Sequence, residues 1–144
     1  LPVEVRVVDT PQDAMAGADL VVTSGPILKH PSPVIEPGWL APGAFACPID
    51  FDSYWKGEAL AEADKLATDD RKQLEYYRTI GYFQTTPRPY ADLGEIVTEQ
   101  RPGRESEAER TICINLGLAL EDMATARLIY DRATQRGIGT ELRL

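Results

Sequence analysis

The chain has 144 residues, of which 43% are hydrophobic and 26% are charged, a composition typical of one globular domain or part of one. Its formal net charge of −8 argues against a nucleic-acid partner, because binding of phosphates needs a basic surface. No apolar run approaches the roughly 18 residues of a membrane-spanning helix, so we expect no membrane insertion.

The amino-terminal third predicts a strand, a helix and a second strand. Residues 3–8 alternate and are rich in β-branched side chains, which predicts a strand. A capped short helix over 12–18 and a strand over 19–24 would complete a right-handed βαβ unit. Four prolines between residues 26 and 37 then indicate a rigid surface loop. The continuous apolar run over 43–49 is typical of a parallel strand that is buried on both faces.

The rest of the chain continues this alternation. Composition and spacing predict helices over 57–65, 71–80 and 91–99, with strands over 66–68 and 110–115.

The strongest predicted element is a helix over 117–136, where apolar residues repeat every three or four positions. Gly137 stands where a glycine C-cap is expected, and residues 139–144 alternate as a final strand would. The chain therefore predicts an α/β fold.

Cysteine and histidine usage restricts the kinds of site. Cys47 and Cys113 lie far apart in apolar runs, and we interpret them as buried thiols of a cytoplasmic protein rather than as a disulfide. His30 is the single histidine, so no histidine-based metal site and no Ser-His-Asp triad is expected. Since the chain opens at Leu1, directly on a predicted strand, we expect it to be part of a longer protein.

Two acids follow the apolar run of 43–49. On an extended backbone Asp50 and Asp52 would point the same way, where they could share a proton or bind a cation. The alternative is that one caps the following helix and the other is solvated. Lys56 could pair with Asp52, neutralise a ligand phosphate, or be an ordinary surface lysine.

Other strand ends are also polar. Thr23 and Ser24 end one predicted strand before a glycine, and Asn115 ends another. Ligands of open α/β sheets bind at such carboxyl ends. However, no Gly-x-Gly-x-x-Gly sequence joins a strand to a helix, so the chain has no glycine-rich phosphate loop of its own.

Taken in order, these strand ends and turns resemble one known family. The motifs are Ala18-Asp19-Leu20-Val21-Val22-Thr23, Trp39-Leu40-x-Pro42-Gly43, the step from Asp52 to Lys56, Leu93-Gly94-Glu95-Ile96-Val97, Gly103-Arg104-x-Ser106, Asn115-Leu116-Gly117-Leu118-Ala119-Leu120-Glu121-Asp122 and Gly137-Ile138-Gly139. Over essentially its whole length the chain resembles the carboxyl-terminal half of the ornithine cyclodeaminase/mu-crystallin family.

The resemblance implies the carboxyl-terminal part of a Rossmann-type NAD(P)-binding domain with a closing long helix and strand. Residues 1–115 would be the second half of that domain. Residues 116–144 would return to an amino-terminal substrate and dimerisation domain outside this chain. The resemblance also implies NAD or NADP as cofactor, a small amino-acid or imino-acid substrate, and a homodimer of the full-length protein.

The resemblance assigns site residues by position. Asp52 matches the family's catalytic aspartate, which acts as a general base toward the substrate amine. Thr23, Ser24, Lys56 and Asn115 match positions that contact or border the dinucleotide.

The implied function is NAD(P)-dependent oxidoreduction or cyclodeamination at the amino or imino carbon of a small amino acid. It would be of the ornithine cyclodeaminase, amino-acid dehydrogenase or ketimine reductase type. Two residues after the aspartate the family usually has proline, where this chain has Tyr54 followed by Trp55, and these bulky residues argue against naming ornithine as the substrate. The alternative is a non-catalytic, crystallin-like protein that binds NAD(P)H. We expect the chain alone to be inactive, because half of the dinucleotide site would lie outside it.

Overall fold

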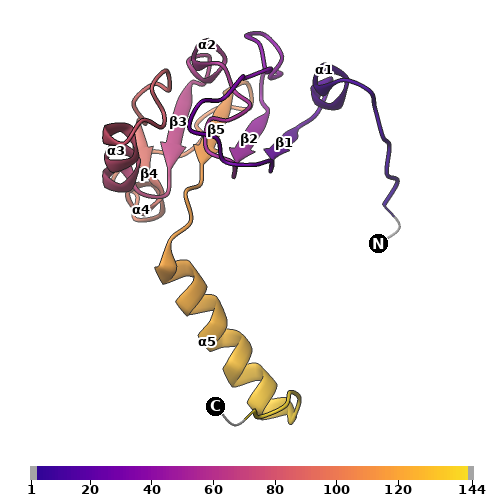
Figure 1. Cartoon of the computed structure of the whole chain (residues 1–144), viewed down its shortest axis with the longest axis vertical. Helices are drawn as coiled ribbons and strands as arrows, with labels where there is room; N and C mark the ends of the chain where they lie inside the picture. The colour runs from indigo at the N-terminus through magenta and orange to yellow at the C-terminus, as the bar shows by residue number, and fades with distance from the viewer. Residues whose placement is uncertain (1–2, 143–144) are drawn as a thin grey trace.

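A five-stranded, all-parallel sheet forms the centre of the computed structural model, which describes residues 3–142 (Figure 1). Across the sheet the strands are β1 (Leu20–Thr23), β2 (Phe45–Pro48), β5 (Thr111–Ile114), β3 (Lys65–Thr68) and β4 (Ala91–Asp92). Because all strands run the same way, the residues that follow them gather at one edge of the sheet. The predicted α/β fold is confirmed.

The helices begin and end where local chemistry allows. They are α1 (Pro11–Met15), α2 (Gly57–Leu60), α3 (Arg71–Thr79), α4 (Leu93–Val97) and α5 (Ala119–Arg136). The Thr10 hydroxyl accepts from the Asp13 amide and caps α1, and Asp70 caps α3 in the same way. Gly137 ends α5 with a φ of +63°, the left-handed conformation expected of a C-cap glycine. The α2 helix is shorter than predicted, because the chain turns after Leu60 to enter β3.

The two faces of the sheet are unequally covered. Along β2, Ala46 and Pro48 are buried, whereas Phe45 and Cys47 are partly exposed. The buried face packs against Trp55, α2 and α3 in one core. On the other face α4 leaves a cavity of about 330 Å³ next to Phe45. The prediction that this strand is buried on both faces is therefore wrong for this chain, because too few elements cover the second face.

Residues 3–8 form no strand, although their sequence alternates as predicted. Figure 1 shows this segment leading away from the sheet, beyond α1. Val3, Val5 and Val7 are 76%, 83% and 89% exposed. A strand needs hydrogen bonds from a neighbouring backbone, and no described strand lies beside this one. Without it, the predicted βαβ unit is not formed either.

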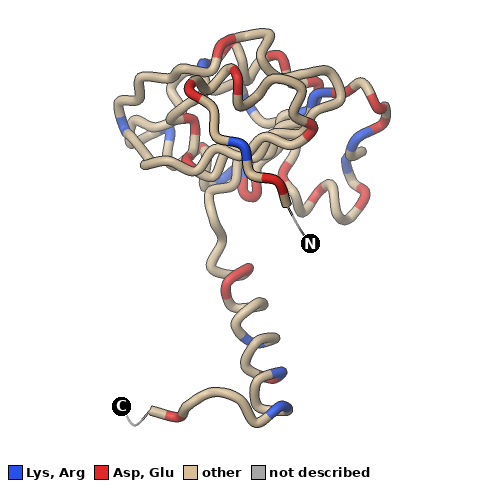
Figure 2. The backbone as a smooth tube through the Cα atoms, turned by 90° about the vertical axis from the view of Figure 1, so that its right-hand side faces the viewer, with Lys and Arg blue, Asp and Glu red and all other residues tan. Residues whose placement is uncertain are grey.

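The α5 helix extends away from the sheet as a single rod (Figure 1). None of its residues is buried. Its charges suit the helix dipole, with Glu121 and Asp122 in the first turn and Arg136 in the last (Figure 2). No helix within residues 3–142 is long and apolar enough to cross a membrane.

The final strand that was predicted for 139–144 is not formed by residues 139–142, which also lack a neighbouring strand. Arg143 and Leu144 at its end, like Leu1 at the start of the chain, lie outside the described residues.

Candidate functional site

Asp50 links the end of β1 to the loop that follows β2. Its side chain is fully buried, at 0% exposure. Oδ1 accepts a hydrogen bond from the Thr23 hydroxyl at 2.7 Å, and Oδ2 accepts one from the Gly25 amide at 3.0 Å. The Thr23 oxygen in turn accepts from Trp55 Nε1 at 3.2 Å. Both carboxylate oxygens are therefore occupied within the protein, which makes Asp50 a structural acid.

Asp52 has a different environment. It is 5% exposed, and Oδ2 accepts a hydrogen bond from the Thr86 hydroxyl at 2.8 Å. Oδ1 is buried and has no hydrogen-bond partner among the residues that the structure describes. Burial raises the pKa of Asp52 above its usual value of 3.8, and the hydrogen bond from Thr86 only partly opposes that rise. This carboxylate therefore has one hydrogen-bonded oxygen and one buried oxygen without a partner among the described residues.

The backbone explains why the two acids differ. Phe51, between them, has a φ of +62°, so the chain turns instead of staying extended. The prediction that both carboxylates point the same way is therefore wrong. Neither acid caps α2 or is solvated, since the helix cap is Lys56 and makes no side-chain cap bond.

A second aromatic residue with left-handed backbone geometry lies close to the first. Phe83 has a φ of +54°, and its ring centroid is 4.8 Å from that of Phe51. Both rings are buried in one core. Non-glycine residues in this conformation are uncommon and occur often at functional sites. The packed rings hold the turn that carries Asp52 against the segment 81–85.

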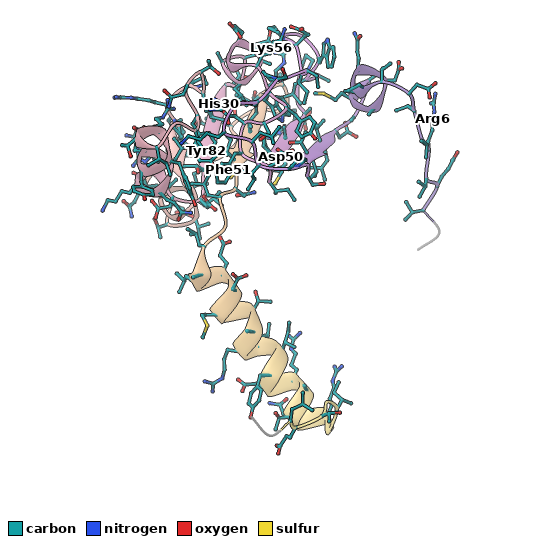
Figure 3. The ribbon with its side chains drawn as sticks, viewed as in Figure 1. Arg6, His30, Asp50, Phe51, Lys56 and Tyr82 are labelled. Carbon is teal, nitrogen blue, oxygen red and sulfur yellow. The ribbon has the colours of Figure 1, made fainter. Side chains whose placement is uncertain are left out.

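A cavity of about 540 Å³ opens onto Asp52. One wall is the proline-rich loop (residues 26–37), which contributes Lys29 and His30, and the other is the segment 81–85. Figure 3 shows His30 near Tyr82, with Phe51 close by. Asp52 is the most buried polar residue of this lining, and a small molecule in the cavity would contact it beside an exposed loop.

Lys56 lies apart from the other predicted site residues. In Figure 3 it is at the α2 end of the molecule, well separated from Asp50 and Tyr82. Its ammonium pairs with Glu36 Oε1 at 2.5 Å and not with Asp52, so of the alternatives that the sequence left open the ion pair with Asp52 is not formed. Lys56 lies beside Glu36 because the preceding residue, Trp55, pairs with Ile35 of the proline-rich loop. Its contact with a cofactor stays a prediction.

Asn115 is held by two thiols. Its amide Nδ2 donates to Cys47 Sγ at 2.9 Å, and Cys113 Sγ donates to its Oδ1 at 3.3 Å. Both cysteines are free, as predicted, although Cys47 is only partly buried. Burial, followed by the neighbouring Cys47, raises the pKa of the Cys113 thiol to about 12, so it stays neutral. The half-buried Asn115 side chain thus has a defined orientation beside the end of β2.

The structure brings Thr23 and Asp50 into contact and leaves the neighbouring Ser24 exposed. Thr86 could not be identified from the sequence, because its contact with Asp52 joins residues 34 positions apart and has no local pattern. Asp69 was not predicted either, and its Oδ2 accepts from the Leu116 and Gly117 amides, both at 2.7 Å. An acid directly after a strand was the available signal in that case.

Known proteins match the chain over almost its full length. The profile of the ornithine cyclodeaminase/mu-crystallin family matches residues 1–137. N-((2S)-2-amino-2-carboxyethyl)-L-glutamate dehydrogenase of Staphylococcus aureus is 33% identical over 140 residues, which cover 92% of this chain and 40% of that protein. Alanine dehydrogenase of Archaeoglobus fulgidus is 27% identical over 141 residues, covering 92% of this chain and 43% of that protein.

A solved structure shares the fold. An archaeal alanine dehydrogenase dimer with bound NAD superimposes with a TM-score of 0.69 at 23% identity, over 96% of this chain and 44% of the other. The chain thus spans about two fifths of the length of the curated relatives that it matches. From the profile match, which covers nearly every residue, the chain belongs to the ornithine cyclodeaminase/mu-crystallin family.

Proposed function

We propose that the protein is an NAD(P)-dependent enzyme that oxidises or reduces the amino or imino carbon of a small amino acid, with Asp52 as its acid/base residue. The observation that carries the proposal is that Asp52 lines a cavity and has a buried Oδ1 without a hydrogen-bond partner among the described residues. A buried oxygen without a partner is costly to the fold, and such groups concentrate where a ligand or a reaction uses them. The dehydrogenase names of two similar proteins support the reaction class.

Asp52 would handle the proton of the substrate nitrogen. In the oxidative direction its carboxylate accepts a hydrogen bond or a proton from the α-amine, so that the nitrogen lone pair can form the imine as hydride leaves the carbon. A raised pKa makes the carboxylate a better base, and Thr86 keeps its other oxygen in place. The imine is then open to attack by water or by a side-chain amine of the substrate. In the reductive direction the protonated carboxyl returns the proton.

NAD or NADP would supply the hydride chemistry, and the residues at the carboxyl edge of the sheet suit the nicotinamide end of such a cofactor. The Ser24 hydroxyl is exposed there, and the Asn115 amide is oriented by its two thiols. The Thr23 hydroxyl is already bonded to Asp50 and Trp55, so its role is to hold the edge in shape. NAD is the cofactor named in the archaeal structure that shares this fold.

We also propose the arrangement of the whole protein. Residues 1–115 would be the second half of the dinucleotide-binding domain, and residues 116–144 would return to an amino-terminal substrate and dimerisation domain of a homodimer. The absence of any buried residue in α5 supports this arrangement. Apolar side chains such as Leu120, Met123 and Tyr130 are 75%, 67% and 67% exposed, as expected of a helix whose partner surface lies elsewhere.

The test uses the full-length protein. Binding of NADH and NADPH is followed by nicotinamide fluorescence, and turnover is then measured on a panel of amino acids and of keto acids with ammonia. We expect Asp52→Asn to lower kcat by about 10²–10⁴-fold with cofactor binding unchanged, the usual contribution of a general base. Normal turnover by this variant would overturn the proposal. Cofactor binding without turnover of any substrate would favour the crystallin-like alternative.

A further inference from the structure

The cavity above Asp52 carries two basic residues on its outer rim. Lys29 and His30 are neighbours on the proline-rich loop, and both are exposed. The stem of Lys29 lies over Gly81 on the opposite wall, where an added Cβ would be 2.8 Å from Lys29 Cε. Gly81 has a φ of +99°, which also favours glycine. The end of the lysine side chain therefore lies against Gly81 instead of extending freely into water.

The charges of the cavity have a clear order. Asp52 is the one acid of its lining, at the inner end, and neither Lys29 nor His30 takes part in any ion pair between residues 3–142. The chain has 23 acids against 15 lysines and arginines, and yet no acid faces these two residues across the cavity mouth. The cavity thus has a buried hydrogen-bond acceptor, Asp52, and two exposed residues at its mouth, the Lys29 ammonium and the His30 imidazole.

We propose that the substrate of this site is a dicarboxylic amino or imino acid, bound with its nitrogen at Asp52 and its distal carboxylate at Lys29 and His30. This inference rests on the proposed function and specifies its substrate class. A lysine and an imidazole N–H both donate to a carboxylate, and such charge-assisted hydrogen bonds are among the stronger ones. The Lys29 ammonium would also repel the second ammonium of a diamino acid, so ornithine would be a poor substrate.

The first test compares substrates of similar length in the full-length protein with its cofactor. L-glutamate, L-glutamine and L-ornithine differ mainly in the charge of the distal group. We expect kcat/KM to be highest for glutamate and lowest for ornithine. The double variant Lys29→Gln/His30→Gln should lose about tenfold or more in kcat/KM for glutamate while glutamine changes by less than about twofold. Lys72→Gln, which removes the same charge from an exposed position on α3, is the matched control and should change neither.

A second measurement does not depend on turnover. Glutarate, which has two carboxylates and no amine, is titrated calorimetrically into the wild-type protein and the double variant. We expect binding by the wild type and its loss in the variant.

The outcomes separate the two proposals. If no amino acid is turned over but the variant loses glutarate, the proposed function fails and the anion site stands. If amino acids are turned over but the variant slows glutamate and glutamine equally, Lys29 and His30 do not select the distal carboxylate, and the inference fails. Absence of glutarate binding by the wild-type protein would also overturn it.

Discussion

Asp50 and Asp52 are two residues apart, and their carboxylates are used in opposite ways. Asp50 accepts two hydrogen bonds and joins β1 to the loop after β2. Asp52 accepts one and keeps the other oxygen free in a buried position. A satisfied buried acid contributes to stability, whereas an unsatisfied one lowers it. Substitution by asparagine should therefore raise the stability of the folded protein at position 52 and lower it at position 50.

For Asp52 we expect a stability gain when the charge is removed. Burial raises the pKa of this carboxyl in the folded state above 3.8, so the folded protein holds the proton more tightly than the unfolded chain does. The stabilisation by the neutral form is complete below the unfolded pKa and is lost as the pH rises through the folded one. Asp52→Asn stays neutral and should melt about 2–4 °C higher than wild type at neutral pH.

Thermal melts of both proteins over a series of pH values check this prediction. The difference in Tm should shrink as the pH is lowered, because the wild-type carboxyl then becomes protonated as well. A lower Tm for the variant at every pH would contradict it.

For Asp50 we expect a loss of stability. Asp50→Asn would place an amide NH₂ group against either the Gly25 amide or the Thr23 hydroxyl, leaving a buried donor without an acceptor. The free energy of unfolding should fall by about 3 kcal/mol, as for other broken buried networks. Urea denaturation measures the change, and Asp9→Asn, at an exposed position, is the control that should leave stability unaltered.

At the scale of elements, the site depends on a close approach between α2 and the segment that carries Thr86. Gly57, the first residue of α2, lies against the backbone of Thr85, and a Cβ there would collide with the Thr85 carbonyl oxygen. Thr86 is the next residue and the hydrogen-bond donor to Asp52. Contact with α2 therefore sets the position of the group that orients the carboxylate.

We expect Gly57→Ala to push this segment away from α2. Overpacking of this kind costs about 1–3 kcal/mol of folding free energy, and kcat should fall because Asp52 loses its orientation. Gly94→Ala is the matched control in the first turn of α4, where the nearest atom to an added Cβ is Asp92 Oδ1 at 3.4 Å. That variant should be unchanged or more stable by up to about 1 kcal/mol. Equal effects of both substitutions on kcat would contradict this role of α2.

At the scale of the whole molecule, the sheet and α5 are energetically separate within this chain. The contacts that tie the connecting segment to the sheet come before the helix, where Asp69 accepts from the Leu116 and Gly117 amides. No residue of α5 is buried. A helix without a buried face gains little from tertiary packing, which is the main source of helix stability in proteins.

Removal of residues 119–144 should consequently leave the folding of the sheet unaltered. We expect the chain ending at Leu118 to melt within about 2 °C of the full chain, because almost no buried area is lost. Circular dichroism would show the loss of helix signal without a shift of the transition. A large drop in Tm would mean that α5 packs on the sheet in solution.

Features that depend on neighbours along the chain were predictable from the sequence. The caps at Thr10 and Gly137, the length of α5 and the apolar runs of the inner strands all follow from side chains within a few residues of one another. The family assignment belongs to this class too, since it rests on short motifs in a fixed order.

Features that depend on a distant partner were decided by the tertiary structure alone. Residues 3–8 have the pattern of a strand and yet form none, because pairing needs a second backbone. From their spacing alone, Asp50 and Asp52 could not be distinguished. The turn at Phe51 places their carboxylates in different environments. Thr23 lies 27 residues before Asp50 and donates a hydrogen bond to it. Thr86 lies 34 residues after Asp52 and donates to one of its oxygens only, so the other oxygen has no partner among the described residues. Neither contact has a local signal in the sequence.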